Sequence, residues 1–241
     1  MRAEFLKIRS MPTPMWCLIG LLICFVLGFA GVIWLGPGED GGATGLAIEI
    51  PTAIASIIFG VWMFGVEFGQ NTLRQALTAD PRRGRLILVK LLVTLLCVAL
   101  VTALLFLLSL PLYDLAASGH EGSIGADALA HIALAAIVLN VVYATVGFAF
   151  ALIAASMAGG ITLALIFLFV IDTVTSIVSW TNDYAMGPAL SAITDNIRPF
   201  GTDFLGDAVT NVTAHDVIVV IAWLVVLIGL GSLRFIRSEV K

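Results

Sequence analysis

Charged side chains are scarce in this chain of 241 residues. Asp, Glu, Lys and Arg together make up 12% of the sequence, whereas 60% of the residues are hydrophobic and the mean hydropathy is +1.09. An ordinary soluble domain is about 25% charged and about 45–50% apolar. The composition therefore argues against a soluble globular protein and favours one whose main solvent is a lipid bilayer.

The residues that build common catalytic and metal sites are also few. The three cysteines, Cys17, Cys24 and Cys97, lie in apolar runs, and we interpret them as small hydrophobic residues rather than a disulfide framework or a metal site. Of the three lysines, none stands in a Gly-x-x-x-x-Gly-Lys-Ser/Thr loop that binds nucleotide phosphates. The apolar runs also lack paired carboxylates and a Ser/His/Asp set. We therefore expect no catalytic residue, no metal site and no ATPase activity in this chain.

Apolar runs of about 20 residues, each enough to cross about 30 Å of hydrocarbon, recur along the whole sequence. They predict six transmembrane helices over residues 15–35, 48–68, 86–112, 128–157, 161–180 and 217–233. Only Ala158, Gly159 and Gly160 separate the fourth span from the fifth, which predicts a tight turn between two antiparallel helices. The expected fold class is all-α, a polytopic membrane protein with a single transmembrane domain over residues 1–241.

Basic residues predict the orientation of these spans, because cytoplasmic loops of membrane proteins are enriched in Lys and Arg. Of the 12 basic residues, only Arg198 falls on the other side of the predicted membrane. The remaining ones precede the first span, lie around the connection between spans two and three, or end the chain: Arg2, Lys7, Arg9, Arg74, Arg82, Arg83, Arg85, Lys90, Arg234, Arg237 and Lys241. We therefore expect both termini to lie in the cytoplasm. The membrane is expected to be the cytoplasmic membrane of a bacterial cell.

Two further segments are too short or too mixed to span the membrane. Residues 1–12 interleave Phe5, Leu6 and Ile8 with basic residues, which predicts an amphipathic helix at the membrane interface. Residues 181–216 combine glycines and prolines with short apolar patches, which favours one or two re-entrant or surface helices at the outer end of the bundle. The alternative for the second segment is an ordinary folded extracellular loop.

The connection at residues 69–85 has the features of a docking element. Residues 72–78 are predicted to form a short helix with Leu73 and Leu77 on one face and Arg74 beside them. The Asp80-Pro81 pair ends this helix before three arginines. Such a short helix can fit a groove on a partner protein.

Around this connection the chain resembles the permeases of type-2 ABC exporters. In that family a Glu near the end of the second span and a Gly precede Thr-Leu-Arg, and a Leu, a Pro with a basic residue and a Lys that opens span three follow. The matching positions here are Glu67, Gly69, Thr72, Leu73, Arg74, Leu77, Pro81, Arg82 or Arg83, and Lys90. The six spans, the cytoplasmic termini and the apolar segment before the last span agree with the same family.

The resemblance implies that the short helix is a coupling helix, which seats in a cleft of a separate ATPase subunit. Two ATPase copies, which carry the ATP and magnesium, and a second permease copy would complete the transporter, most simply as a homodimer. The partners are then ATPase subunits, a second permease and membrane lipids, with no nucleic acid and no cofactor on this chain. The expected cargo of such an efflux permease is a hydrophobic or amphiphilic molecule such as a drug, an antimicrobial peptide or a lipid.

Charged residues near the docking segment admit more than one interpretation. Glu67 lies near the inner end of an apolar span and needs a partner, for which Arg74 and Lys90 are the candidates. Arg82 and Arg83 are either part of the docking surface or anchors for anionic lipid headgroups, and the two roles are compatible.

Polar residues inside the spans are costly in lipid and are therefore candidates for the substrate pathway. Asp172 would either face a cavity and meet polar or cationic substrate groups, or form a helix contact in a dimer core, and its neighbours Thr173, Thr175 and Ser176 are the candidates to satisfy it. Asn140 and Tyr143, three residues apart, would line a cavity or hold helices together.

Two other classes of protein are weighed against the exporter. An ion-coupled secondary carrier would usually show inverted repeats and several buried acids in place of Asp172 alone. A membrane-embedded lipid-modifying enzyme would need a catalytic set, which the sequence lacks.

Overall fold

In the computed structural model, residues 19, 23, 42–69, 83–117, 126–178, 180–197 and 212–237 are described, with some side chains near the helix ends left out. These residues are helical almost throughout and contain no β-strand, which confirms the all-α prediction. The predicted interfacial helix at residues 1–12 lies outside the described residues. So does the predicted first span at residues 15–35, apart from Ile19 and Ile23.

Nine helical elements follow one another in the described part of the chain: α3 (Gly42–Gly69), α5 (Arg83–Ala117), α6 (Ala126–Ala154), α7 (Met157–Ile166), the π-helix η1 (Phe167–Asp172), α8 (Thr173–Ile177), the 3-10 helix η2 (Asn182–Tyr184), α9 (Met186–Ile197) and α10 (Ala214–Arg237). The elements α7, η1 and α8 run on as one long helix. Five helices of this part are long and apolar enough to cross a membrane. They coincide with the second to sixth predicted spans, so the chain has the character of a multi-pass membrane protein.

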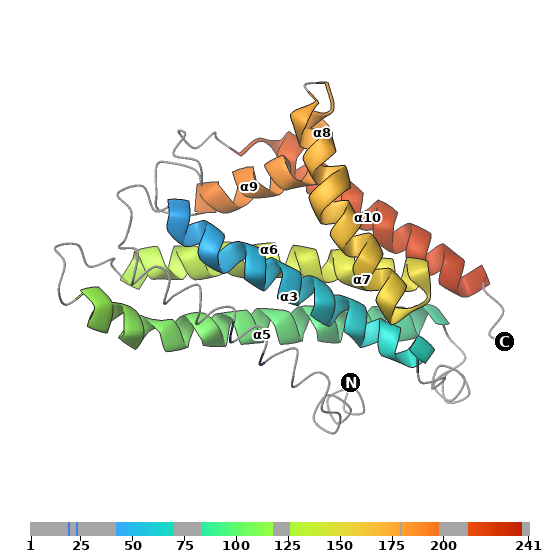
Figure 1. Cartoon of the computed structure of the whole chain (residues 1–241), viewed down its shortest axis with the longest axis horizontal. Coiled ribbons are helices and arrows are strands. Elements are labelled where there is room, and N and C mark those ends of the chain that lie inside the picture. The colour runs from blue at the N-terminus through green and yellow to red at the C-terminus, as the bar shows by residue number, and fades with distance from the viewer. Residues whose placement is uncertain are drawn as a thin grey trace.

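Helices α3 and α6 form the centre of the bundle (Figure 1), and both are largely buried. Helix α6 also contacts α5, α7, α9 and α10, so it touches most of the other elements. The end of α3, the start of α5, the turn between α6 and α7 and the end of α10 lie at one end of the bundle, on the right in Figure 1. We call this the basic end, because Arg83, Arg85, Arg234 and Arg237 are there.

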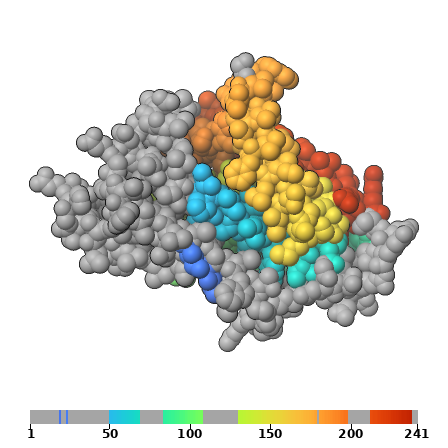
Figure 2. Space-filling view, in the orientation of Figure 1, coloured from blue at the N-terminus to red at the C-terminus, as the bar shows by residue number. Residues whose placement is uncertain are grey.

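The outward faces of the other helices are apolar. Exposed leucines recur at every fourth position of α5, at Leu88, Leu92, Leu96, Leu100 and Leu104. Helices α7 and α8 form a ridge across α3 (Figure 2) and, together with α10, expose further large hydrophobic side chains. Such a continuous apolar exterior would be costly in water and is what lipid-facing helices require.

Two glycines allow α3 and α6 to cross at very short distance. A Cβ atom added to Gly60 would collide with the carbonyl oxygen of Ala144, and one added to Gly147 would collide with that of Ile57. Small residues at such crossings let two helix backbones approach each other closely. Close packing matters in lipid because an apolar side chain gains little by exchanging contacts with lipid tails for contacts with another helix. The crossing fixes the two central helices against each other.

The turn between α6 and α7 lies earlier than predicted. Ala155 has a positive φ of 52°, and Ser156 caps α7 by accepting a hydrogen bond from the backbone N–H of Gly159. The prediction that Ala158, Gly159 and Gly160 form the turn is therefore wrong, because the two glycines belong to the first turn of α7. Gly160 is needed for packing, since a Cβ there would lie 2.9 Å from a methyl carbon of Val61.

The segment before the last span contains the helices η2 and α9. At about 1.5 Å per residue, the 12 residues of α9 reach about 18 Å, which is too short to cross the membrane. Helix α9 buries one face against α6 and α10. The indole N–H of Trp223 on α10 donates to the carbonyl oxygen of Tyr184 at 2.9 Å and ties η2 to the bundle. The re-entrant position of this segment in a membrane stays a prediction.

Candidate docking end and cavity

The structure describes the two ends of the predicted docking segment. Glu67 and Gly69 end α3, and Arg83 and Lys90 lie at the start of α5. The residues between them that carry the predicted coupling helix lie outside the described residues: Thr72, Leu73, Arg74, Leu77, Pro81 and Arg82. The structure therefore shows only the residues on either side of the predicted coupling helix.

An ion pair joins the flanks of the docking segment. The Nζ atom of Lys90 lies 3.0 Å from Oε1 of Glu67, and the two side chains are only 1% and 3% exposed. Lys90 also donates to the carbonyl oxygen of Met63 at 3.3 Å, and its ammonium lies 5.8 Å from the ring centre of Phe64. Of the two partners predicted for Glu67, the structure brings Lys90 to it.

Burial makes this ion pair a strong constraint on helix position. Two charges that leave water need close mutual contact to offset their desolvation, and removal of one leaves the other uncompensated. The pair lies beside the aromatic cluster of Phe64, Phe148 and Phe235, whose rings meet edge to face at centroid distances of 5.1 and 5.5 Å. The last turns of α3 are thus fixed to the second turn of α5.

Arg83 joins the start of α5 to the end of α10. Its Nη1 atom donates to the carbonyl oxygens of Phe235 at 3.1 Å and Ile236 at 2.9 Å, and its guanidinium lies 6.0 Å from the Phe235 ring centre. The last carbonyls of a helix lack intrahelical donors and carry partial negative charge, so a cation there is stabilising. This contact within the chain was not foreseen from the sequence, because it joins residues more than 150 positions apart.

Asn140 and Tyr143 have different surroundings. Asn140 is 2% exposed; its Oδ1 atom accepts from the hydroxyl of Ser56 at 3.1 Å, and its Nδ2 atom donates to that of Thr102 at 3.4 Å. It therefore holds α3, α6 and α5 together, one of the two predicted roles. Tyr143 takes the other role and lines a cavity.

Asp172 has a different partner from the one predicted. Its Oδ1 atom accepts a hydrogen bond of 2.8 Å from the backbone N–H of Gly187 at the start of α9. The hydroxyls of Thr175 and Ser176 donate to backbone carbonyls of their own helix. For Thr175 and Ser176, the prediction that neighbouring hydroxyls satisfy Asp172 is therefore wrong. The carboxylate connects the end of η1 to α9, and a Cβ atom on Gly187 would collide with it.

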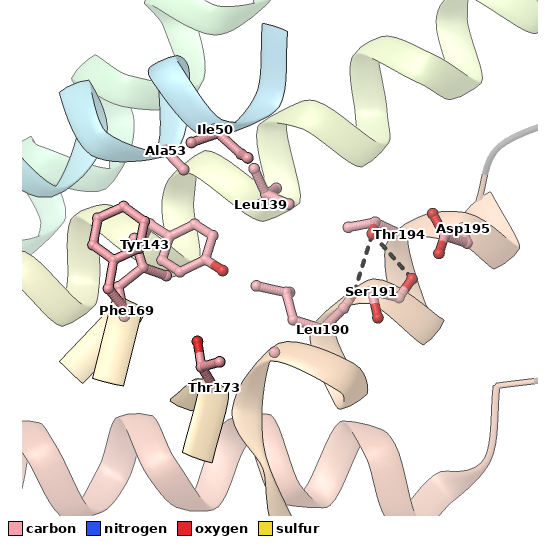
Figure 3. A pocket seen from close by; sticks show the side chains of 12 residues that line it. Ile50, Ala53, Leu139, Tyr143, Phe169, Thr173, Leu190, Ser191, Thr194 and Asp195 are labelled. Carbon is pink, nitrogen blue, oxygen red and sulfur yellow. Dashed lines mark hydrogen bonds between the residues drawn. The ribbon is translucent and has the colours of Figure 1, made fainter. Parts of the chain in front are cut away.

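A cavity of about 320 Å³ lies beside this contact, between α3, α6, η1, α8 and α9. Its apolar wall includes Ile50, Leu139, Phe169 and Leu190 (Figure 3), together with Leu168.

The polar part of the cavity wall comes from three helices. Tyr143 stands on α6, Thr173 begins α8, and Ser191, Thr194 and Asp195 lie along α9. The hydroxyls of Ser191 and Thr194 are bonded to backbone carbonyls of α9. The sequence did not single out Asp195, because only the packing of α9 on α6 makes it part of the cavity wall.

Within the described ranges, no group of three His, Cys, Asp or Glu side chains is placed to hold a metal ion. Comparison of the chain with models of protein families, with curated protein sequences and with solved structures finds no match.

Proposed function

We propose that this chain is the membrane-spanning subunit of a type-2 ABC exporter, which moves a hydrophobic or amphiphilic substrate outward while a separate ATPase subunit hydrolyses ATP. The proposal includes six transmembrane helices in a bacterial cytoplasmic membrane, both termini in the cytoplasm, a re-entrant α9, and assembly as a homodimer with two ATPase copies.

The observation that carries this proposal is the anchoring of the docking segment at both ends. Residues 70–82 leave α3 just after Glu67 and enter α5 at Arg83. The Glu67–Lys90 ion pair fixes the end of α3 to α5, and Arg83 fixes the start of α5 to α10. A partner that displaced residues 70–82 would act on three helices together, as a coupling element must.

The charge of the basic end supports the orientation. Arg83 and Arg85 begin α5, and Arg234 and Arg237 end α10, which the Arg83 hydrogen bonds bring beside it. Basic residues at one end of a bundle of apolar helices favour the cytoplasmic side for that end.

The test is purification of the full-length chain with the ABC ATPase encoded beside it, followed by ATP hydrolysis in lipid nanodiscs. We expect Leu77→Glu and Arg74→Glu to abolish ATPase capture, because the first places a charge on the apolar face that would enter the partner's groove and the second reverses the charge beside it. The matched control is Arg234→Glu, which reverses an exposed charge at the same end but outside residues 70–82. It should bind the ATPase as wild type does.

Two results would contradict the proposal. Wild-type protein that neither captures nor stimulates the ATPase would favour an ion-coupled carrier. Equal losses in Arg234→Glu and Arg74→Glu would show that the basic end acts as a general anchor for lipid headgroups and that residues 72–78 have no special docking role.

A further inference from the structure

The second half of the long helix formed by α7, η1 and α8 packs loosely on the bundle. Of the five described spans, this helix has the smallest buried share, and α8 projects at the upper edge of the molecule (Figure 1). Phe167 is 3% exposed and contacts the rings of Phe150 and Trp223 at centroid distances of 5.5 and 5.3 Å. We call residues 168–177, which follow it, the distal segment. Most of its large side chains are exposed: Phe169, Val170, Ile171, Val174 and Ile177.

The backbone of the distal segment is built to bend. It begins in the π-helix η1, and π turns inside α-helices are rare and frequent at functional sites. The hydroxyl of Thr175 donates to the carbonyl oxygens of Ile171 and Asp172, both at 2.9 Å. A π turn, or a side chain that enters the backbone hydrogen-bond ladder, is a recognised place for a helix to bend. The distal segment has both features within one turn.

Asp172 holds the distal segment against α9. Its Oδ1 atom accepts the hydrogen bond of 2.8 Å from the backbone N–H of Gly187, in the first turn of α9. A carboxylate at a helix N-terminus is favourable, and a hydrogen bond to a charged acceptor is stronger than a neutral one. The next tie to the bundle comes after the distal segment, where Trp223 bonds to the carbonyl oxygen of Tyr184. Between Phe167 and that point, one charged side chain secures the segment to α9.

This contact lies at the edge of the cavity of about 320 Å³. Gly187 itself lines the cavity. Phe169 and Thr173 of the distal segment stand on one side of it, and Leu190 of α9 stands on the other (Figure 3). Separation of Asp172 from Gly187 would therefore move two cavity walls apart. The opening would lead to the surrounding lipid, because the outward side chains of the distal segment are exposed.

We propose that the distal segment is a gate of the cavity and that Asp172 is its latch. The gate is closed while the carboxylate accepts from Gly187, and it opens when this bond breaks and residues 168–177 bow away from α9. The gate itself depends only on these contacts within the chain. Its use as the route of an amphiphilic substrate rests on the proposed exporter function. Opening is therefore tested on the permease chain without an ATPase, so the two proposals can fail separately.

The experiment measures how fast N-ethylmaleimide modifies a cysteine in the cavity of the full-length chain in phosphatidylcholine nanodiscs. The three native cysteines are replaced by alanine, and Leu190→Cys is the reporter, because Leu190 lines the cavity and is 1% exposed. Asp172→Ala removes the acceptor and should raise the rate about ten- to a hundredfold, since the rate follows the population of the open form. Gly187→Ala should also raise it, because its Cβ collides with the Asp172 carboxylate. This second change adds atoms at the cavity, so a larger cavity would not explain both results.

Two controls separate gate opening from a general loss of structure. Asp183→Asn removes an exposed acid on η2 that does not line the cavity, and the reporter in this variant should react at the unchanged rate. A second reporter, Ala164→Cys, replaces a fully buried residue of α7 and should stay protected in every variant. The proposal is overturned if Asp172→Ala or Gly187→Ala leaves the rate at Leu190→Cys unchanged. An equal rise at Ala164→Cys also overturns it, because the contact would then hold the whole bundle together. If Asp172→Ala does not fold, Gly187→Ala decides, and an unchanged rate there rejects the gate.

Discussion

Replacing Lys90 by Met should destabilise the bundle by about 3–5 kcal/mol, because it leaves the carboxylate of Glu67 buried without its ammonium partner. Both side chains are almost completely buried, and their closest atoms are 3.0 Å apart. The contacts of Lys90 with the Met63 carbonyl and the Phe64 ring are lost as well. Met fills a similar volume, so the loss reports charge and hydrogen bonding more than a cavity.

A double-mutant cycle separates the ion pair from these other contacts. Glu67→Gln alone leaves the cation buried and should also be destabilising. The double variant Glu67→Gln/Lys90→Met carries no charge at these two positions, so it should be more stable than the sum of the single losses predicts. We expect a coupling energy of about 1.5–3 kcal/mol, in the upper range for residues in direct contact.

Reversible unfolding in mixed detergent micelles measures these free energies. Arg85→Met is the matched control, since it removes an exposed positive charge from the same helix and should cost less than about 1 kcal/mol. Strictly additive single losses, or a cost for Lys90→Met no greater than that for Arg85→Met, would refute the reasoning that a desolvated ion pair fixes α3 to α5.

Three further changes test the packing of the bundle by the same unfolding measurement. Gly147→Ala should destabilise the protein by about 1–3 kcal/mol, because the added Cβ collides with the Ile57 carbonyl. The control is Gly229→Ala, whose added Cβ meets nothing within 4 Å and which should be neutral or stabilising. Equal changes in the free energy of unfolding for the two variants would contradict the close crossing of α3 and α6. Ala155→Gly should stabilise by about 1 kcal/mol because glycine adopts the positive φ of 52° without strain, and a destabilised variant would contradict this turn. Asn140→Leu should cost about 1–3 kcal/mol because two buried hydroxyls lose their partner, and a neutral result would count against the network.

Hydropathy was sufficient to find the spans that the structure describes, because apolar length is a local property of the sequence. A carboxylate in an apolar span needs a cationic partner, and few basic residues lie near that end of the span. Lys90 was therefore one of only two candidates for Glu67. The structure of residues 72–78, on which the family resemblance mainly rests, lies outside the described residues.

The predictions that were wrong depended on tertiary contacts. The hydroxyls of Thr175 and Ser176 bond to carbonyls one turn earlier in their own helix, and the Asp172 carboxylate finds its donor at Gly187 on another element. The pair Gly159-Gly160 suggested a turn because glycine tolerates unusual φ values, whereas α7 uses Gly160 to pack against Val61. At 3.6 residues per turn, Asn140 and Tyr143 lie about 60° apart on α6, enough to face different neighbours.

Polar contacts and close helix crossings explain why this bundle has one arrangement. In lipid, an apolar helix face gains little by choosing one apolar neighbour over another, so hydrophobicity alone does not select partners. The Glu67–Lys90 pair joins α3 to α5 at the basic end, Asn140 joins α3, α6 and α5 near their middle, and Asp172 joins η1 to α9. Each of these contacts satisfies a polar group that would be costly in lipid without a partner. A helix that moved along its neighbour, or packed against a different helix, would lose the contact. The polar residues thus specify the arrangement that brings α9 over the cavity and fixes the ends of the docking segment.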